Sequence, residues 1–333
     1  MNTPELTTVR RTEKHSPVWL LSAARLMPEK PPRFGVQILH GFSDKKERWF
    51  PFMQFIAACG GVAVIHDLRG FGATVPEGTD GKTAPADLGY SYETLMDDLD
   101  AVWRESLPEP DDLPRFLFGH GMGALIAGLH TAARPAEVTG LILSGLPHRE
   151  RLVSPALGWF ALESVFTGDG ARLPLLNRIA ATRYNKGFTP EPASDGRYLW
   201  TTNDLAARYE FAADPVCCRD HPLGDYRNLL RLTRDFWRPS SWEKPGGIPV
   251  LCMAGESDPV SGGRKGMQRA VRFLGDMGFR AGSKVYPGMR HDLFMDTERE
   301  TPYTDAMRFV LTRLPKRPAA PAPDQTEGTE GTA

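Results

Sequence analysis

A strand, a glycine-rich turn and a helix near the middle of the chain constrain the fold more than any other segment. Residues 115–123 read Arg-Phe-Leu-Phe-Gly-His-Gly-Met-Gly, and a segment of mostly small residues follows from Ala124 to Ala133. Glycine at positions 119 and 123 lets a strand and a helix pass within contact distance at a sharp turn. The central residue of such a turn has a positive φ, which costs a residue with a Cβ about 1–3 kcal/mol. The segment therefore predicts a tight strand-to-helix turn centred on Gly121.

Short apolar runs bounded by turn residues alternate with helical patterns along most of the chain. The expected strands are 17–21, 34–40, 62–68, 116–119, 139–144, 248–254 and 284–286. The expected helices are 49–59, 92–107, 123–133, 265–277 and 303–314. Continuous apolar strands separated by helices predict an α/β fold with a mostly parallel, doubly wound sheet.

The alternation stops between about Pro147 and Pro239, in a stretch that is rich in aromatic residues and proline. We expect this stretch to be a helical lid over the carboxyl edge of the sheet, where α/β proteins bind ligands. The predicted organisation is an α/β core in two parts, 1–146 and 240–314, a lid over 147–239, and a tail over 315–333. The tail has no apolar periodicity, which predicts disorder.

Composition excludes several classes of partner. A net charge of −1 gives no sign of a nucleic-acid or anionic-membrane partner. No apolar run reaches the length of a transmembrane span, and residues 1–15 lack the apolar core of a signal peptide. The cysteines have neither metal-site spacing nor a disulfide framework, which predicts reduced thiols in a cytoplasmic protein; they are Cys59, Cys217, Cys218 and Cys252.

The turn at Gly121 has the layout of G-x-S-x-G, in which a serine nucleophile sits between a strand and a helix. Here the nucleophile position holds Gly121, which has no hydroxyl. The strand 34–40 ends in His40-Gly41 and leads to Phe42. The backbone N–H groups of Phe42 and Met122 are the expected donors of an oxyanion hole.

An acid and a histidine follow in the order that a nucleophile–acid–histidine triad requires. Asp258 comes directly after the strand 248–254, and His291 comes shortly after the last expected strand. Asp258 is predicted to orient the imidazole of His291, and His291 is predicted to act as the general base. No other cluster of histidine, cysteine and carboxylate residues has the spacing of a metal site, so we expect neither a metal nor a cofactor.

Seven motifs make the chain similar to the monoacylglycerol lipase and lysophospholipase group of α/β hydrolases over about residues 15–314. They are Leu39-His40-Gly41-Phe42, His66-Asp67-Leu68-Arg69-Gly70-Phe71-Gly72, Gly119-His120-Gly121-Met122-Gly123, Tyr184-Asn185-Lys186-Gly187-Phe188, Ala213-Asp214-Pro215-Val216-Cys217, Gly255-Glu256-Ser257-Asp258-Pro259-Val260 and Tyr286-Pro287-Gly288-Met289-Arg290-His291. The resemblance implies a hydrolase with a helical lid that cleaves single-chain acyl esters such as monoacylglycerols and lysophospholipids. It also implies that Gly121 replaces the family's serine.

Gly121 leaves several interpretations open. The chain is expected to be a carboxylic-ester hydrolase that is inactive or impaired, because no acyl-enzyme forms without a nucleophile. Alternatives are a pseudoenzyme that binds an acyl ligand or a protein partner, and a hydrolase that uses another nucleophile, for which Ser43 is the nearest candidate, or water activated by His291. In a further alternative, the glycines of this turn bind a dinucleotide. The strand 139–144 lacks the acidic residue that this last function requires.

Overall fold

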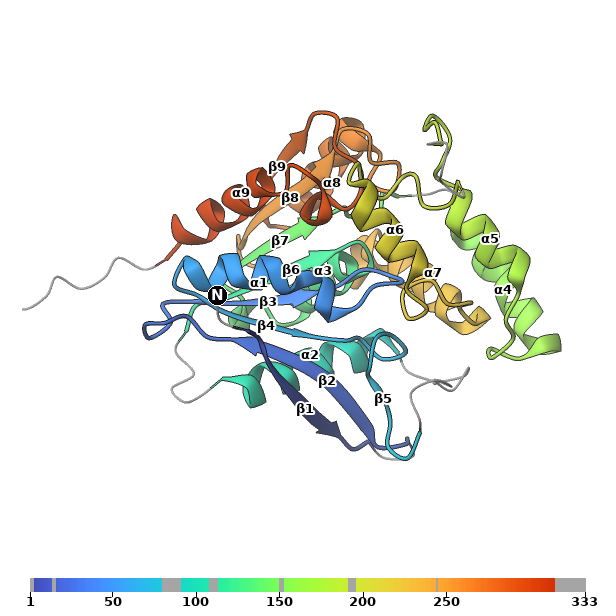
Figure 1. Cartoon of the computed structure of the whole chain (residues 1–333), viewed down its shortest axis with the longest axis horizontal. Coiled ribbons are helices and arrows are strands. Elements are labelled where there is room, and N and C mark those ends of the chain that lie inside the picture. The colour runs from blue at the N-terminus through green and yellow to red at the C-terminus, as the bar shows by residue number, and fades with distance from the viewer. Residues whose placement is uncertain are drawn as a thin grey trace, which may run out of the picture.

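The computed structural model describes residues 3–13, 16–79, 91–107, 113–149, 153–190, 196–243 and 245–314. Within these residues, nine strands form one sheet in the order β1-β2-β4-β3-β6-β7-β8-β9, with β5 paired to β2 (Figure 1). The strands are β1 (Glu5–Arg11), β2 (Trp19–Leu26), β3 (Gly35–Leu39), β4 (Val62–His66), β5 (Val75–Pro76), β6 (Arg115–His120), β7 (Gly140–Ser144), β8 (Pro249–Gly255) and β9 (Arg280–Tyr286). Neighbouring strands are parallel in the part of the sheet ordered β4-β3-β6-β7-β8-β9. At the other end, β2 pairs antiparallel with β1, β4 and β5.

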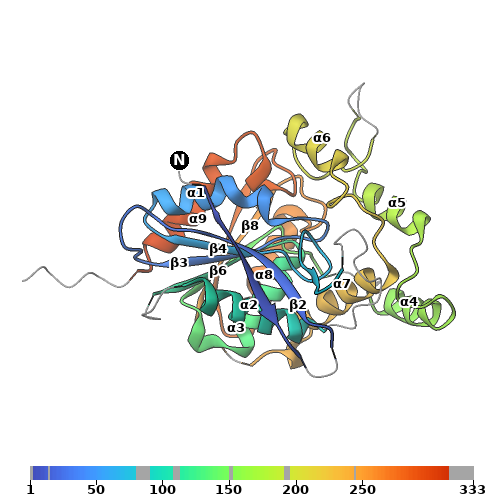
Figure 2. The ribbon, with the colours of Figure 1, turned by 60° about the horizontal axis from the view of Figure 1, so that its bottom comes forward.

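Helices cover both faces of this sheet (Figures 1 and 2). The α-helices are α1 (Phe50–Ala58), α2 (Tyr92–Ser106), α3 (Met122–Ala133), α4 (Val153–Thr167), α5 (Pro174–Thr182), α6 (Leu205–Ala213), α7 (Leu223–Phe236), α8 (Gly263–Asp276) and α9 (Glu300–Leu311). The short 3₁₀ helices are η1 (Lys46–Trp49), η2 (Pro135–Glu137), η3 (Pro239–Ser241) and η4 (Leu293–Met295). Helices α1 and α9 share one apolar core with the sheet, and α3 and α8 share another on the opposite face. These findings confirm the predicted fold class.

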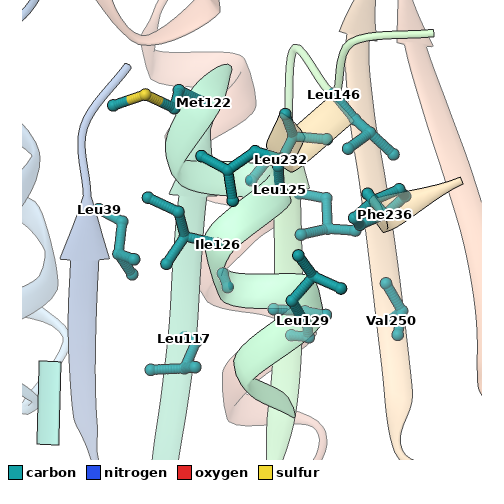
Figure 3. Close-up of a cluster of buried hydrophobic side chains, with 14 of the residues drawn as sticks. Leu39, Leu117, Met122, Leu125, Ile126, Leu129, Leu146, Leu232, Phe236 and Val250 are labelled. Atoms are coloured by element: carbon teal, nitrogen blue, oxygen red, sulfur yellow. The ribbon is translucent and has the colours of Figure 1, made fainter. Parts of the chain in front are cut away.

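Helix α3 lies at the centre of the molecule, and its residues 122–132 are all buried. Figure 3 shows Leu125, Ile126 and Leu129 of this helix among side chains of the neighbouring strands and of α7. A helix that is apolar on every side is stable only when it is covered on every side. The packing therefore fixes where the helix begins, and with it the position of Gly121.

The turn before α3 has the geometry that its glycines predict. Gly121 has φ 54° and ψ −115°, and its N–H donates to the carbonyl of Ser144 over 2.9 Å. A Cβ added to Gly119 would lie 2.3 Å from the carbonyl oxygen of Gly123, and one added to Gly123 would lie 2.3 Å from that of Leu39. The close approach of the backbones thus requires glycine at both flanking positions.

The expected elements were found within a few residues, but two strands were not predicted. Strand β1 buries only Val9 among its seven residues, so its sequence shows little apolar alternation. Strand β5 has only two residues. Between β7 and β8 the described chain forms α4 to α7, and α7 packs against α3 and α4. No helix in the described part of the chain is both long and apolar enough to cross a membrane. The expected tail, 315–333, lies outside the described residues.

We expect Gly123→Ala to lower the free energy of unfolding more than Gly121→Ala. At position 123 the added carbon would press on the backbone of β3, which no rotamer change can relieve. At position 121 the nearest atom would be 3.4 Å away, so the cost is the strain of a positive φ, about 1–3 kcal/mol. Urea unfolding followed by circular dichroism measures both losses. A smaller loss for Gly123→Ala would contradict the close approach.

Candidate active site

A cavity of about 680 Å³ lies at the carboxyl ends of the central strands. It is lined by the loop after β3, the turn before α3, the helices α4, α5 and α7, and the loop that follows β9. Apolar side chains of the three helices form much of its wall, namely Val153, Ala156, Phe160, Leu176, Leu229 and Leu230. Its volume falls in the range of roughly 300–1,000 Å³ that is usual for small-molecule sites.

The structure brings Gly121, His291 and Asp258 together at this edge of the sheet. A Cβ added to Gly121 would lie 3.4 Å from Nε2 of His291. On the other side of the ring, Nδ1 lies 3.1 Å from each carboxylate oxygen of Asp258. A side-chain oxygen at position 121 would therefore face a histidine that a carboxylate orients.

The protonation of this pair follows from its hydrogen bonds. An ionised Asp258 only accepts, so Nδ1 of His291 carries a proton and donates it, and Nε2 is left toward position 121. Burial disfavours the charged imidazolium, but the carboxylates of Asp258, Asp292 and Asp44 outweigh burial and raise the pKa of His291 above its ordinary value. Burial also disfavours the ionised form of Asp258, yet its interactions with His291 lower the pKa of that carboxyl.

A buried charge network surrounds the pair. Arg48 donates to Asp44 over 2.9 Å and to Asp292 over 3.0 Å. Asp292 also lies 3.2 Å from Nε2 of His120, whose ring centroid is 4.6 Å from that of His291. Burial of Asp292 disfavours its ionised form, yet His120 and Arg48 hold the pKa of that carboxyl well below its usual range. Asp44, Arg48 and Asp292 were not predicted from the sequence, although Asp292 directly follows His291.

The loop after β3 is fixed by His40. Its Nδ1 lies 2.8 Å from the carbonyl oxygen of Gly41, and its Nε2 accepts the N–H of Leu68 over 2.9 Å. Phe42 and Met122, the expected oxyanion donors, both line the cavity. Met122 is the first residue of α3, so its N–H has no acceptor within the helix.

Ser43 is also part of the cavity wall, and its partner is a histidine remote in sequence. Its Oγ lies 2.7 Å from Nε2 of His221, and Nδ1 of His221 lies 3.1 Å from Oδ2 of Asp225. Ser43 was a candidate from the sequence, whereas His221 and Asp225 were not. The available signal was the spacing of four residues between His221, which precedes the N-cap Pro222 of α7, and Asp225 in the first turn of that helix.

Two groups of side chains in the described residues have donor atoms close enough to share a metal ion. They are His120, His291 and Asp292, and Asp100, His130 and Glu137. In each group a histidine nitrogen is already paired with a carboxylate, at 3.2 Å for His120 and Asp292 and at 2.8 Å for His130 and Asp100. These hydrogen bonds account for both groups without an ion.

Comparison with known proteins identifies the family of the chain. Residues 30–298 match the model of a hydrolase family described as serine aminopeptidase, S33. The chain belongs to this family. Membership agrees with the parallel sheet, the turn before α3 and the His291–Asp258 pair at the carboxyl edge.

Two relatives with named activities are similar over most of their length. A monoacylglycerol lipase of Mycolicibacterium smegmatis is 25% identical over 292 residues, which is 86% of this chain and 91% of the relative. The phospholipase YtpA of Bacillus subtilis is 25% identical over 284 residues, covering 83% of this chain and 94% of the relative. The chain is thus an α/β hydrolase of the monoacylglycerol lipase and phospholipase type.

A solved structure supports the same fold. The structure of a thermostable carboxyl esterase from Bacillus coagulans, determined in complex with glycerol, superimposes with a TM-score of 0.76. The alignment covers 95% of this chain and all of the esterase, at 22% sequence identity. This likeness shows a shared fold.

We expect Asp258→Asn to lower the pKa of His291. The substitution removes the largest of the interactions that favour the imidazolium, while burial continues to oppose it. A carboxylate at this distance contributes about 1–3 pH units. Titration of the His291 ring carbon by NMR in ¹³C-histidine-labelled protein measures the change. A pKa of His291 that rises or stays constant would contradict the pairing.

Proposed function

We propose that the protein binds single-chain acyl esters in the 680 Å³ cavity and that its Gly121 centre is strongly impaired in hydrolysing them. The observation that carries this proposal is the direction of position 121, whose Cβ would lie 3.4 Å from the free nitrogen of a carboxylate-bound histidine. The family relatives, a monoacylglycerol lipase and a phospholipase, act on lipid esters and support the ligand class.

Because position 121 is glycine, the proposed centre lacks the hydroxyl of a nucleophile and keeps the general base and the oxyanion donors. Without Oγ, the covalent route through an acyl-enzyme is closed at this position. What remains is His291, able to take a proton from water, and the N–H groups of Phe42 and Met122, which we propose as oxyanion donors. In serine hydrolases that lose part of the triad, such residual features sustain about 10³–10⁴-fold acceleration over water.

The helical segment α4–α7 is proposed to act as a lid. Its helices contribute the apolar wall of the cavity, which fits an acyl chain because burying apolar surface contributes about 25 cal/mol per Å². Four large apolar residues of α4 and α5 are more than half exposed, namely Leu162, Val165, Phe166 and Leu175. An exposed apolar surface beside the cavity suits a protein that takes its ligand from a lipid aggregate.

We expect Gly121→Ser to gain ester hydrolysis that Gly121→Ala does not. Both variants carry the same backbone strain, so the difference between them isolates the hydroxyl. The gain in kcat/KM on p-nitrophenyl esters and monoacylglycerols is expected to be about 10²-fold or more, since nucleophile and base act together. The gain should disappear in Gly121→Ser combined with His291→Ala.

The pH dependence gives this prediction a sign. His291 must be neutral to accept a proton, and its pKa is raised above the ordinary histidine value of about 6.5. The activity added by Gly121→Ser should therefore decrease as the pH is lowered, with its midpoint at a pH above about 6.5. If the serine variant adds no activity, or adds activity that survives loss of His291, the proposed centre is wrong.

A further inference from the structure

A second serine, histidine and carboxylate are joined by hydrogen bonds in the same cavity. Oγ of Ser43 lies 2.7 Å from Nε2 of His221, and Nδ1 of His221 lies 3.1 Å from Oδ2 of Asp225. We propose that Ser43 is a nucleophile toward acyl esters, with His221 as its general base and Asp225 as the residue that orients His221. This inference takes its substrate class from the proposed function but does not depend on the Gly121 centre.

The hydrogen bonds have the polarity that nucleophilic catalysis requires. An ionised Asp225 can only accept, so Nδ1 of His221 is the protonated nitrogen. In a neutral ring the remaining nitrogen, Nε2, is then an acceptor, and the hydroxyl of Ser43 donates to it. This is the orientation in which a histidine takes the proton of an attacking serine.

The surroundings of His221 keep it in the neutral form that a base needs. The ring is buried, with 3% of the residue exposed, and burial lowers its pKa below the ordinary value. Asp225 acts in the opposite direction by favouring the imidazolium, whereas the charges of Arg219 and Arg172 disfavour it. The ring is therefore uncharged near pH 7 and available to accept a proton.

Packing holds the base in place from two sides. The His221 ring lies against Phe42 of the loop after β3, with centroids 4.4 Å apart. Its backbone N–H donates to Oδ1 of Asn177 on α5 over 2.9 Å. Asp225 accepts a second hydrogen bond from Arg219 over 3.0 Å. A general base held by ring packing and by fixed hydrogen bonds needs little reorganisation when it reacts.

The backbone of Ser43 is also unusual. Ser43 has φ 60°, and among the described residues other than glycine only Tyr198 shares a positive value. Such a conformation costs about 1–3 kcal/mol and persists where the surroundings impose it, which is frequent in active sites. Ser43 directly follows Phe42, so the proposed nucleophile and one proposed oxyanion donor belong to neighbouring residues.

The reaction balances with water as the only co-reactant. Oγ of Ser43 forms a bond to the ester carbonyl carbon while its proton passes to Nε2 of His221. The ester C–O bond then breaks, and the leaving alcohol takes that proton from His221. Water, deprotonated in turn by His221, attacks the acyl group on Ser43, and the fatty acid departs as the proton returns to Oγ. The net change is ester and water to acid and alcohol.

The test is covalent labelling of the native chain with dodecyl fluorophosphonate, in which a serine oxygen displaces fluoride from phosphorus. Mass spectrometry of tryptic peptides places the adduct, because the peptide 34–45 contains Ser43 as its one serine. Trypsin does not cleave between Arg134 and Pro135, so position 121 lies in the peptide 116–149, whose one serine in the native chain is Ser144. We expect the adduct on Ser43. Ser43→Ala should abolish it, and His221→Asn should slow it by about 10²–10⁴-fold.

Matched variants separate this role from a structural one. A hydrogen bond that only ties the loop after β3 to the helical segment would make Ser43→Ala lower the melting temperature without any adduct in the native chain. Ser283→Ala, which removes an exposed serine on β9 outside the cavity, should label like the native chain. The labelling rate should fall to half its full value only at a pH below the ordinary histidine value of about 6.5, since the pKa of His221 is lowered from that value.

The outcomes distinguish the two proposals. An unlabelled native chain, or an adduct that persists in Ser43→Ala, overturns the role of Ser43. If Gly121→Ser combined with Ser43→Ala is then labelled on the peptide 116–149, and fragmentation places the adduct at position 121 and not at Ser144, the Gly121 centre stands and only the Ser43 proposal fails. If the native chain is labelled on Ser43 but this double variant is not labelled, the Ser43 proposal stands and the proposed centre at Gly121 fails.

Discussion

The structure depends on the close approach of three backbones at the turn before α3. Gly119 and Gly123 allow α3 to begin directly against β6 and β3, where any Cβ would lie 2.3 Å from a carbonyl oxygen. Because α3 is buried on all sides, the helix cannot shift to relieve a misfit. The same packing places position 121 opposite His291 and Met122, the first residue of the helix, in the wall of the cavity. The geometry of the site is thus a consequence of how the core packs.

Burial of charge around this turn is balanced by pairing. Asp44, Asp292 and Asp258 are all buried, and each is hydrogen-bonded to a cation or a histidine. A buried carboxylate without such a partner would cost several kcal/mol, so Arg48 is needed to keep Asp44 and Asp292 ionised beside the cavity. The same carboxylates raise the pKa of His291, while His221, with burial dominant, has a lowered one. One cavity therefore holds two histidines tuned in opposite directions.

Much of this arrangement could be predicted from the sequence, because local patterns determine it. The continuous apolar strands and the helices between them predicted the parallel sheet. Because Gly121, Asp258 and His291 each follow a strand, they were expected at one edge of the sheet, and the structure brings them together there. Strand β1 escaped prediction because an edge strand with one buried residue has no periodic signal. The bond between Ser43 and His221 joins positions 178 residues apart, so it depends on how α7 packs over the core and no local pattern reports it. The sequence alone shows that position 121 lacks the hydroxyl of a nucleophile. The structure adds that a side chain at this position would lie next to His291.

The most direct test of the central claim is a crystal structure of Gly121→Ser after reaction with an alkyl fluorophosphonate. We expect phosphorus bonded to the side-chain oxygen at position 121, with His291 Nε2 within hydrogen-bond distance of that oxygen. We also expect a phosphoryl oxygen about 2.7–3.1 Å from the N–H groups of Phe42 and Met122, and the alkyl chain along the apolar wall of α4, α5 and α7. A position 121 that stays unmodified, or a phosphoryl oxygen that points away from both N–H groups, would contradict the claim.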